Sequence, residues 1–122
     1  MTWTPITIEE IYDMILATER DLNGELLNFW ELIKIYPEKW NEETYGKEGN
    51  GFWVVGLIGR RVIYFNDIEE GFNISDYKTY GTIDNYFCNQ DKLVWAIQEL
   101  FDLIKSGGHV QGQAGPPINL RP

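Results

Sequence analysis

The stretch GFWVVGLIGRRVIYF, residues 51–65, decides the fold. It holds two runs rich in Val, Ile and aromatic residues, 52–58 and 61–65, and such runs are typical of β-strands. Gly59 and Arg60 stand between the runs, and a two-residue turn with glycine first suits a tight hairpin. The register that follows pairs Ile58 with Arg61, Leu57 with Val62, Gly56 with Ile63 and Val55 with Tyr64.

Both faces of this hairpin are apolar near its middle. Successive side chains of a strand point to opposite faces, so a strand with one solvated face alternates between apolar and polar residues. Residues 52–58 do not alternate in this way. We therefore expect a sheet that is covered on both sides, or covered on one side and exposed as an adhesive surface on the other.

The chain after the hairpin predicts a turn and two further strands. Residues 66–71 form the turn, in which Asn66 and Asp67 bond their own backbone and Gly71 supplies an unusual φ angle. Residues 72–74 are the predicted third strand and residues 82–87 the predicted fourth.

A last helix follows these strands. Asn89 or Asp91 is the expected N-cap, and Gly107 with Gly108 ends the helix, because glycine tolerates the left-handed conformation found after helix ends. Its expected buried stripe consists of Leu93, Ile97, Leu100, Phe101 and Ile104.

Before the hairpin the sequence predicts two amphipathic helices. Thr7 and Glu10 have the spacing of a capping box, so the first helix begins there. Asn23 and Gly24 interrupt the helical pattern of apolar residues, which then resumes and runs to Ile35. An αα-hairpin is the simplest interpretation, and a single kinked helix is the alternative. The apolar positions are Ile8, Ile11, Tyr12, Ile15, Leu16 and Leu22, followed by Leu26, Phe29, Trp30 and Ile33.

Together these elements predict an α+β fold. An antiparallel sheet of about four strands packs against the N-terminal helices and a C-terminal helix. Pro37 bars continuation of the second helix, and residues 37–51 are expected to form a loop with at most one helical turn. The length of 122 residues fits a single domain, 1–108, followed by a flexible Gly- and Pro-rich tail, 109–122.

Charge and composition exclude several classes of protein. Ten Lys and Arg against nineteen Asp and Glu give a net charge of −9, which argues against direct binding of nucleic acid. The hydrophobic fraction of 43% is ordinary for a globular domain, which excludes a disordered acidic chain. The sequence contains no apolar run of about 18 residues, so no membrane contact is expected. A single cysteine and the lack of a secretion signal predict a cytoplasmic protein.

The sequence contains no motif that fixes a chemistry, and we expect no enzyme activity, no cofactor and no metal. Its single histidine, His109, lies in the predicted tail, and Cys88 is expected to be a small apolar core residue. Structural zinc needs about four Cys or His ligands, and the chain has two such residues in total. Residues 66–73 alternate acids and amides around Gly71, yet they lack the ligand spacing of a calcium loop.

Aromatic residues make up 15% of the chain, so some of them must stay partly exposed. Three tryptophans lie in predicted elements and are expected in the core or at its edge: Trp30, Trp53 and Trp95. Four aromatics lie in predicted loops, where anchors for a partner occur: Trp40, Tyr45, Tyr77 and Tyr80.

Acidic residues surround the loop aromatics, and this is the composition of a surface that binds a basic protein. The expected rim includes Glu42, Glu43, Asp76 and Asp84. The candidate partner-binding residues are Asp67, Glu69, Glu70, Asp76, Tyr77, Tyr80 and Asp84.

Three stretches carry a resemblance to a known class: 51–59 (GFWVVGLIG), 64–73 (YFNDIEEGFN) and 86–91 (YFCNQD). With the acidic composition, they resemble the immunity proteins that bacteria make against polymorphic and contact-dependent-inhibition toxins. The resemblance implies a non-catalytic domain that binds a cognate toxin, with the acidic turn 67–70 as one contact. Such proteins share no catalytic pattern, so no catalytic residue carries over.

Three hypotheses follow for the function. The first is an immunity protein that occludes a toxin domain, in particular a basic nuclease. The negative charge of this chain would accelerate its association with such a basic domain. The second is a non-catalytic adaptor or accessory subunit of a cytosolic assembly. The third is an enzyme or small-ligand binder that uses carboxylates and tyrosines alone, which requires a closed apolar pocket with a carboxyl group of raised pKa. The sequence leaves the oligomeric state open.

Overall fold

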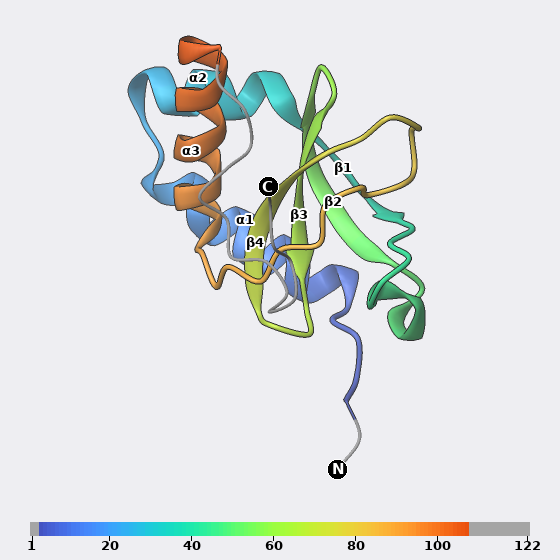
Figure 1. The fold of residues 1–122 in the computed structure, drawn as a ribbon. Coiled ribbons are helices and arrows are strands. Elements are labelled where there is room, and N and C mark those ends of the chain that lie inside the picture. Colours follow the sequence, from blue (N-terminus) through green and yellow to red (C-terminus); the bar gives the residue numbers. More distant parts are fainter. Residues whose placement is uncertain (1–2, 108–122) are drawn as a thin grey trace.

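A computed structural model describes residues 3–107 (Figure 1). Within this range four antiparallel strands form one sheet in the order β1-β2-β3-β4, with helices packed on it, which confirms the predicted α+β fold. The predicted tail, 109–122, lies outside the described residues. The elements are α1 (Ile8–Asp21), α2 (Gly24–Ile33), β1 (Lys34–Trp40), the 3-10 helix η1 (Gly46–Gly49), β2 (Phe52–Ile58), β3 (Arg61–Asn66), β4 (Gly71–Asp76) and α3 (Leu93–Ser106).

The predicted hairpin is β2 and β3. The turn at Gly59 and Arg60 is confirmed, as are the pairs of Ile58 with Arg61, Leu57 with Val62 and Gly56 with Ile63. The predicted pair of Val55 with Tyr64 is wrong, because a β-bulge shifts the register and places Tyr64 opposite Val54. A bulge inserts one extra residue into a strand, and local sequence does not reveal it.

The bulge and Gly56 together make room for the helices. Val55 packs in the cluster that faces the helices, while Val54 packs in the cluster on the opposite face of the sheet. A Cβ atom on Gly56 would lie 3.3 Å from the Trp30 ring and 3.5 Å from Ile33. The small residue therefore lets α2 approach the sheet closely.

The strand content differs from the prediction at two places. The predicted loop 37–51 is wrong only at its start, because residues 34–40 form β1 and α2 ends at Ile33. The rest of this range is a loop with the 3-10 helix η1, as predicted. Proline is tolerated in β1 because β1 is an edge strand that pairs only with β2. On the other side of β1 there is no neighbouring strand to which the missing N–H of Pro37 would have to donate. The predicted strand 82–87 is also wrong, because only Thr82 makes an isolated bridge, to Asn41.

Side chains of the sheet hold the segment that replaces the predicted fourth strand. We call residues 77–91 the strap. The Tyr64 hydroxyl donates to Asn85 O (2.9 Å) and accepts from Phe87 N (2.8 Å). Asn73 exchanges two bonds with the backbone of Asn89, at 3.0 and 2.9 Å. Further bonds join Asn66 Nδ2 to Phe87 O and Ser75 Oγ to Asn85 N.

Two apolar clusters cover the two faces of the sheet, which is the first of the two alternatives that the hairpin sequence leaves open. Figure 1 shows the helices together on one side and the yellow-to-orange strap crossing the other. The cluster facing the helices includes Trp30, Ile63 and Ile97. The cluster under the strap consists of Trp40, Phe52, Val54, Val62, Tyr64, Ile83 and Tyr86.

The helix ends follow the predictions in part. The capping box of Thr7 and Glu10 is confirmed, and α1 and α2 are two separate helices, as an αα-hairpin requires. The predicted cap of α3 is wrong, because Lys92 is its N-cap residue and the backbone of Asp91 instead accepts a bond from Phe72 N. Gly107 ends α3 with a φ of 69°, as predicted.

Some predicted core residues are exposed. Trp30 is buried and Trp53 is partly buried. The prediction for Trp95 is wrong, because 54% of its surface is exposed. Ile104 is 40% exposed, and Ala96 belongs to the buried stripe of α3 with Leu93, Ile97 and Leu100. Cys88 is partly buried against the cluster under the strap.

Replacement of Asn73 by alanine tests the attachment of the strap. The change removes both bonds to Asn89 and leaves its backbone N–H and C=O without these partners, so the free energy of unfolding should fall by roughly 2–4 kcal/mol. Urea unfolding measures this difference. The matched control is Asn28→Ala on the exposed side of α2, which should change stability by less than about 0.5 kcal/mol. Equal effects of the two changes would contradict the attachment.

Candidate functional site

The predicted partner-binding residues fall into two groups at opposite ends of the sheet. Asp67, Glu69 and Glu70 lie in the turn between β3 and β4, whereas the other four lie at the end of β4 and in the strap. β4 has six residues, so the two groups are separated by about 17 Å along the strand. The structure therefore does not bring all seven residues into one site.

Asp67 is a buried structural residue. Only 9% of its surface is exposed, and its Oδ2 accepts a 2.9 Å bond from Ile6 N. Its carbonyl oxygen accepts from the Trp3 indole at 3.1 Å. Burial raises the pKa of the Asp67 carboxyl group, while the Ile6 bond and the charge of Lys39 oppose the shift. Asp67 fixes the segment before α1 and is not accessible to a partner.

The turn after β3 matches its prediction only in part. Asn66 Oδ1 accepts from the amides of Ile68 and Glu69, as predicted. The unusual φ belongs to Glu70, at 60°, so the prediction for Gly71 is wrong. Gly71 is required for a different reason, since a Cβ atom there would lie 2.1 Å from the Asn89 carbonyl oxygen.

Glu69 and Glu70 have different surroundings. The charge of Glu69 contributes to raising the pKa of Tyr86 and of Cys88, both on the strap side, although burial is the larger cause for each. Glu70 lines a groove of about 350 Å³ on the other side, with α1 residues such as Met14 and with Phe72. The two carboxylates do not form a joint site.

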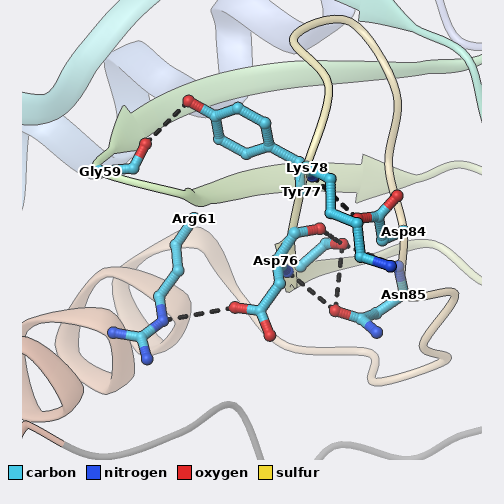
Figure 2. A network of polar contacts seen from close by, with 8 residues as sticks. Gly59, Arg61, Asp76, Tyr77, Lys78, Asp84 and Asn85 are labelled. Carbon is cyan, nitrogen blue, oxygen red and sulfur yellow. Dashed lines mark hydrogen bonds and ion pairs between the residues drawn. The ribbon is translucent and has the colours of Figure 1, made fainter.

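Three residues of the second group, Asp76, Tyr77 and Asp84, lie in a network that closes the first half of the strap (Figure 2). Asp76 pairs with Arg61, with 3.5 Å between Oδ1 and Nε. Asp84 Oδ2 accepts from Lys78 N at 2.9 Å, and Asn85 Oδ1 accepts from Asp76 N at 2.8 Å. These bonds hold residues 77–84 as a closed loop beside the sheet, with Asp84 exposed on the loop and Asp76 exposed just before it, at the end of β4.

Tyr77 and Tyr80 meet over Trp40. The hydroxyl group of Tyr77 donates to Gly59 O at 2.7 Å, as Figure 2 shows. The ring centroid of Trp40 lies 5.0 Å from that of Tyr77 and 4.7 Å from that of Tyr80. Trp40 itself is buried, whereas Tyr80 is 61% exposed. The loop thus presents the exposed side chain of Tyr80, which packs on the buried ring of Trp40.

Glu38 fixes Tyr80 from β1. Its Oε1 accepts a 2.6 Å bond from the Tyr80 hydroxyl and a 3.0 Å bond from the Trp40 indole. These bonds lower the pKa of Glu38, and the bond to Glu38 raises the pKa of Tyr80. We call Glu38, Trp40, Tyr77 and Tyr80 the Tyr80 site. Sequence reasoning missed Glu38 because residues 37–51 were predicted as a loop, and only in a strand do residues 38 and 40 share one face.

A second exposed tyrosine lies on the same side of the sheet. Tyr45 is 46% exposed and packs on Tyr86 with 4.5 Å between ring centroids. Glu42, expected on the acidic rim, is instead 2% exposed, because it accepts backbone bonds from Thr44, Tyr45 and Gly46. Glu43 is exposed, as a rim residue must be.

The helix side carries a groove that the sequence did not predict. It has a volume of about 300 Å³ and lies between α1 and the start of β1. Glu19, in its lining, accepts bonds from the Trp30 indole (2.7 Å) and from Lys34 Nζ (3.1 Å). Two exposed apolar residues line this groove, Leu16 (52%) and Tyr36 (75%).

Among residues 3–107, no group of three His, Cys, Asp or Glu side chains is placed to hold a metal ion. Burial raises the pKa of the Cys88 thiol, which favours its protonated, weakly nucleophilic form. His109 lies outside the described residues. No helix in the described part of the chain has the length and apolar character needed to cross a membrane.

Comparison of the chain with protein-family models, curated protein sequences and solved structures found no match. The resemblance to immunity proteins therefore remains a prediction.

The buried carboxyl group of Asp67 predicts a pH dependence that an Asp67→Asn variant lacks. Its pKa in the folded protein lies above the ordinary value of 3.8, so the folded state binds this proton more tightly than the unfolded state. The contribution of this group to stability therefore decreases as pH rises through the raised pKa. Between about pH 4 and pH 7 the wild type should lose stability relative to Asp67→Asn, measured by urea unfolding of both proteins. A constant difference between them would show that burial does not affect this carboxyl group.

Proposed function

We propose that this protein is a non-catalytic inhibitor that binds a basic protein, namely an immunity protein that occludes a bacterial toxin domain. The observation that carries the proposal is the Tyr80 site, where an exposed tyrosine is fixed beside the carboxylate of Glu38. The net charge of −9 supports a basic partner such as a nuclease domain. Complementary charge accelerates such an encounter and disfavours acidic competitors.

Tyr80 has the properties of an anchor residue. Large aromatic side chains near the centre of an interface contribute most to binding, particularly when little entropy is lost on docking. The Trp40 ring and the Glu38 carboxylate already restrict the Tyr80 side chain. Binding would therefore immobilise few additional degrees of freedom.

The mechanism proposed is steric and electrostatic occlusion. Tyr80 would enter a cleft of the toxin while Asp76, Asp84 and Glu38 pair with its Lys or Arg residues. A stable interface buries about 1,600 Å² in total, which is more than one loop supplies. Tyr45, exposed on the same side of the sheet, extends the surface. Asp67 has no part in it, because it is buried.

An accessory subunit of a larger assembly is the second candidate function. The observation that favours it is the groove between α1 and β1, with Leu16 and Tyr36 exposed in its lining. An exposed apolar face of the sheet would also have favoured an accessory subunit. The structure has no such face within the described residues, because apolar clusters cover both sides of the sheet. The two functions use opposite sides of the molecule, so mutations can separate them.

Co-expression tests the proposed function. The C-terminal region encoded by the gene immediately upstream should be lethal alone, harmless together with this protein, and should co-elute with it in gel filtration. Tyr80→Ala should weaken the complex about tenfold or more, as loss of an interface anchor does. Tyr36→Ala, which removes an equally large exposed tyrosine from the helix side, is the matched control and should leave the affinity unchanged.

Two results would contradict the immunity function. One is a harmless neighbouring product, and the other is a lethal product that this protein neither neutralises nor binds. Loss of the complex in Tyr36→Ala but not in Tyr80→Ala would instead place the interface on the helix side and favour the accessory subunit.

A further inference from the structure

Glu38 has one carboxylate oxygen that its own neighbours leave open. Both bonds that fix this side chain, from Tyr80 and from Trp40, end on Oε1. Within residues 3–107, no bond to Oε2 accompanies them. A carboxylate offers about four acceptor positions on its two oxygens, so Glu38 is oriented while retaining the capacity to accept bonds from a partner.

Tyr80 places an aromatic ring beside this carboxylate. The ring packs on Trp40, with the two planes inclined at 54°, and 61% of the residue remains exposed. Its hydroxyl donates to Glu38 at 2.6 Å, so ring and carboxylate are held next to each other. An exposed aromatic surface attracts cations through its quadrupole, and an adjacent carboxylate adds charge and directional acceptors.

We propose that Glu38 and Tyr80 form a binding site for an arginine side chain of the protein partner. The guanidinium group stacks on the exposed part of the Tyr80 ring and donates to Oε2 of Glu38. This inference rests on the proposed function and names the group of the basic partner that the Tyr80 site recognises.

Arginine fits this arrangement better than lysine. A guanidinium group is planar, stacks on aromatic rings and carries several donors in one plane, whereas an ammonium group is a compact and strongly hydrated charge. Two cations of the neighbouring strands have other partners, because Lys39 donates to Gly49 O and Gly51 O and Arg61 pairs with Asp76. The bonds to Glu38 also lower its pKa, so the carboxylate carries its charge at neutral pH.

NMR titration with two small probes tests the site. The probes are N-acetyl-arginine amide and N-acetyl-lysine amide, added to ¹⁵N-labelled protein at equal ionic strength. The Trp40 indole N–H reports on Glu38 directly, because it donates to the same carboxylate. The arginine probe should shift this signal in a saturable manner and bind about threefold or more tightly than the lysine probe. Trp95, also exposed, is the internal control and should shift less.

Variants assign the effect to the two residues. Glu38→Gln and Tyr80→Leu should each weaken the arginine probe about threefold or more, and Tyr80→Phe, which keeps the ring, should weaken it less than Tyr80→Leu. Glu25→Gln, at an exposed position of α2, is the charge-matched control. Unchanged indole signals of Trp30 and Trp53 confirm that each variant is folded. Equal shifts with both probes, or full binding in Tyr80→Leu, would overturn the inference.

The test separates this inference from the proposed function. A toxin that is neutralised equally well by wild type and Glu38→Gln, with no arginine preference at Trp40, would refute the arginine site and leave the immunity function intact. An arginine preference at Trp40 without neutralisation of the neighbouring product would support the arginine site and contradict the immunity function.

Discussion

Hydrogen bonds between buried side chains of β3 and β4 and the backbone of the strap hold the strap on the sheet. Tyr64, Asn66, Asn73 and Ser75 are almost completely buried, and each bonds the strap. A buried polar group that lacks a hydrogen-bond partner lowers the free energy of unfolding by about 1–3 kcal/mol. These side chains therefore need the strap as their partner, and the strap needs them for its attachment. The bonds attach the strap to the sheet without a fifth strand, and the apolar cluster beneath it stays closed.

The same attachment builds the Tyr80 site. Asn85 bonds Ser75 and Asp76, and Ile83 N donates to Asn41 O at the end of β1. With both ends of residues 77–84 fixed in this way, Tyr77 and Tyr80 lie over Trp40. The exposed tyrosine and the carboxylate of Glu38 therefore owe their positions to bonds inside the domain. The surface that we propose for partner binding is thus formed before any partner arrives.

The sequence predicted the features that depend on local pattern and missed those that depend on distant contacts. Residues 51–65 revealed the hairpin, since turn chemistry and β-propensity agree there, and Thr7 with Glu10 revealed the start of α1. β1 was missed because Pro37 argues against a strand unless the strand is known to lie at an edge. For the candidate site, their position in a loop predicted Tyr77 and Tyr80 as partner-binding residues, and this role stays a prediction. Asp67 was misjudged because its burial comes from residues of the N-terminal segment more than 60 positions away.

Amide hydrogen exchange at Phe87 and Asn89 tests the central claim most directly. Both N–H groups lie outside the strands, and both donate to buried side chains, Tyr64 Oη at 2.8 Å and Asn73 Oδ1 at 2.9 Å. They should exchange at least about a hundredfold more slowly than the amide of Thr79, in the exposed part of the strap, and close to the rate of amides in β3. Exchange as fast as that of Thr79 would contradict the claim that the sheet's side chains hold the strap in place.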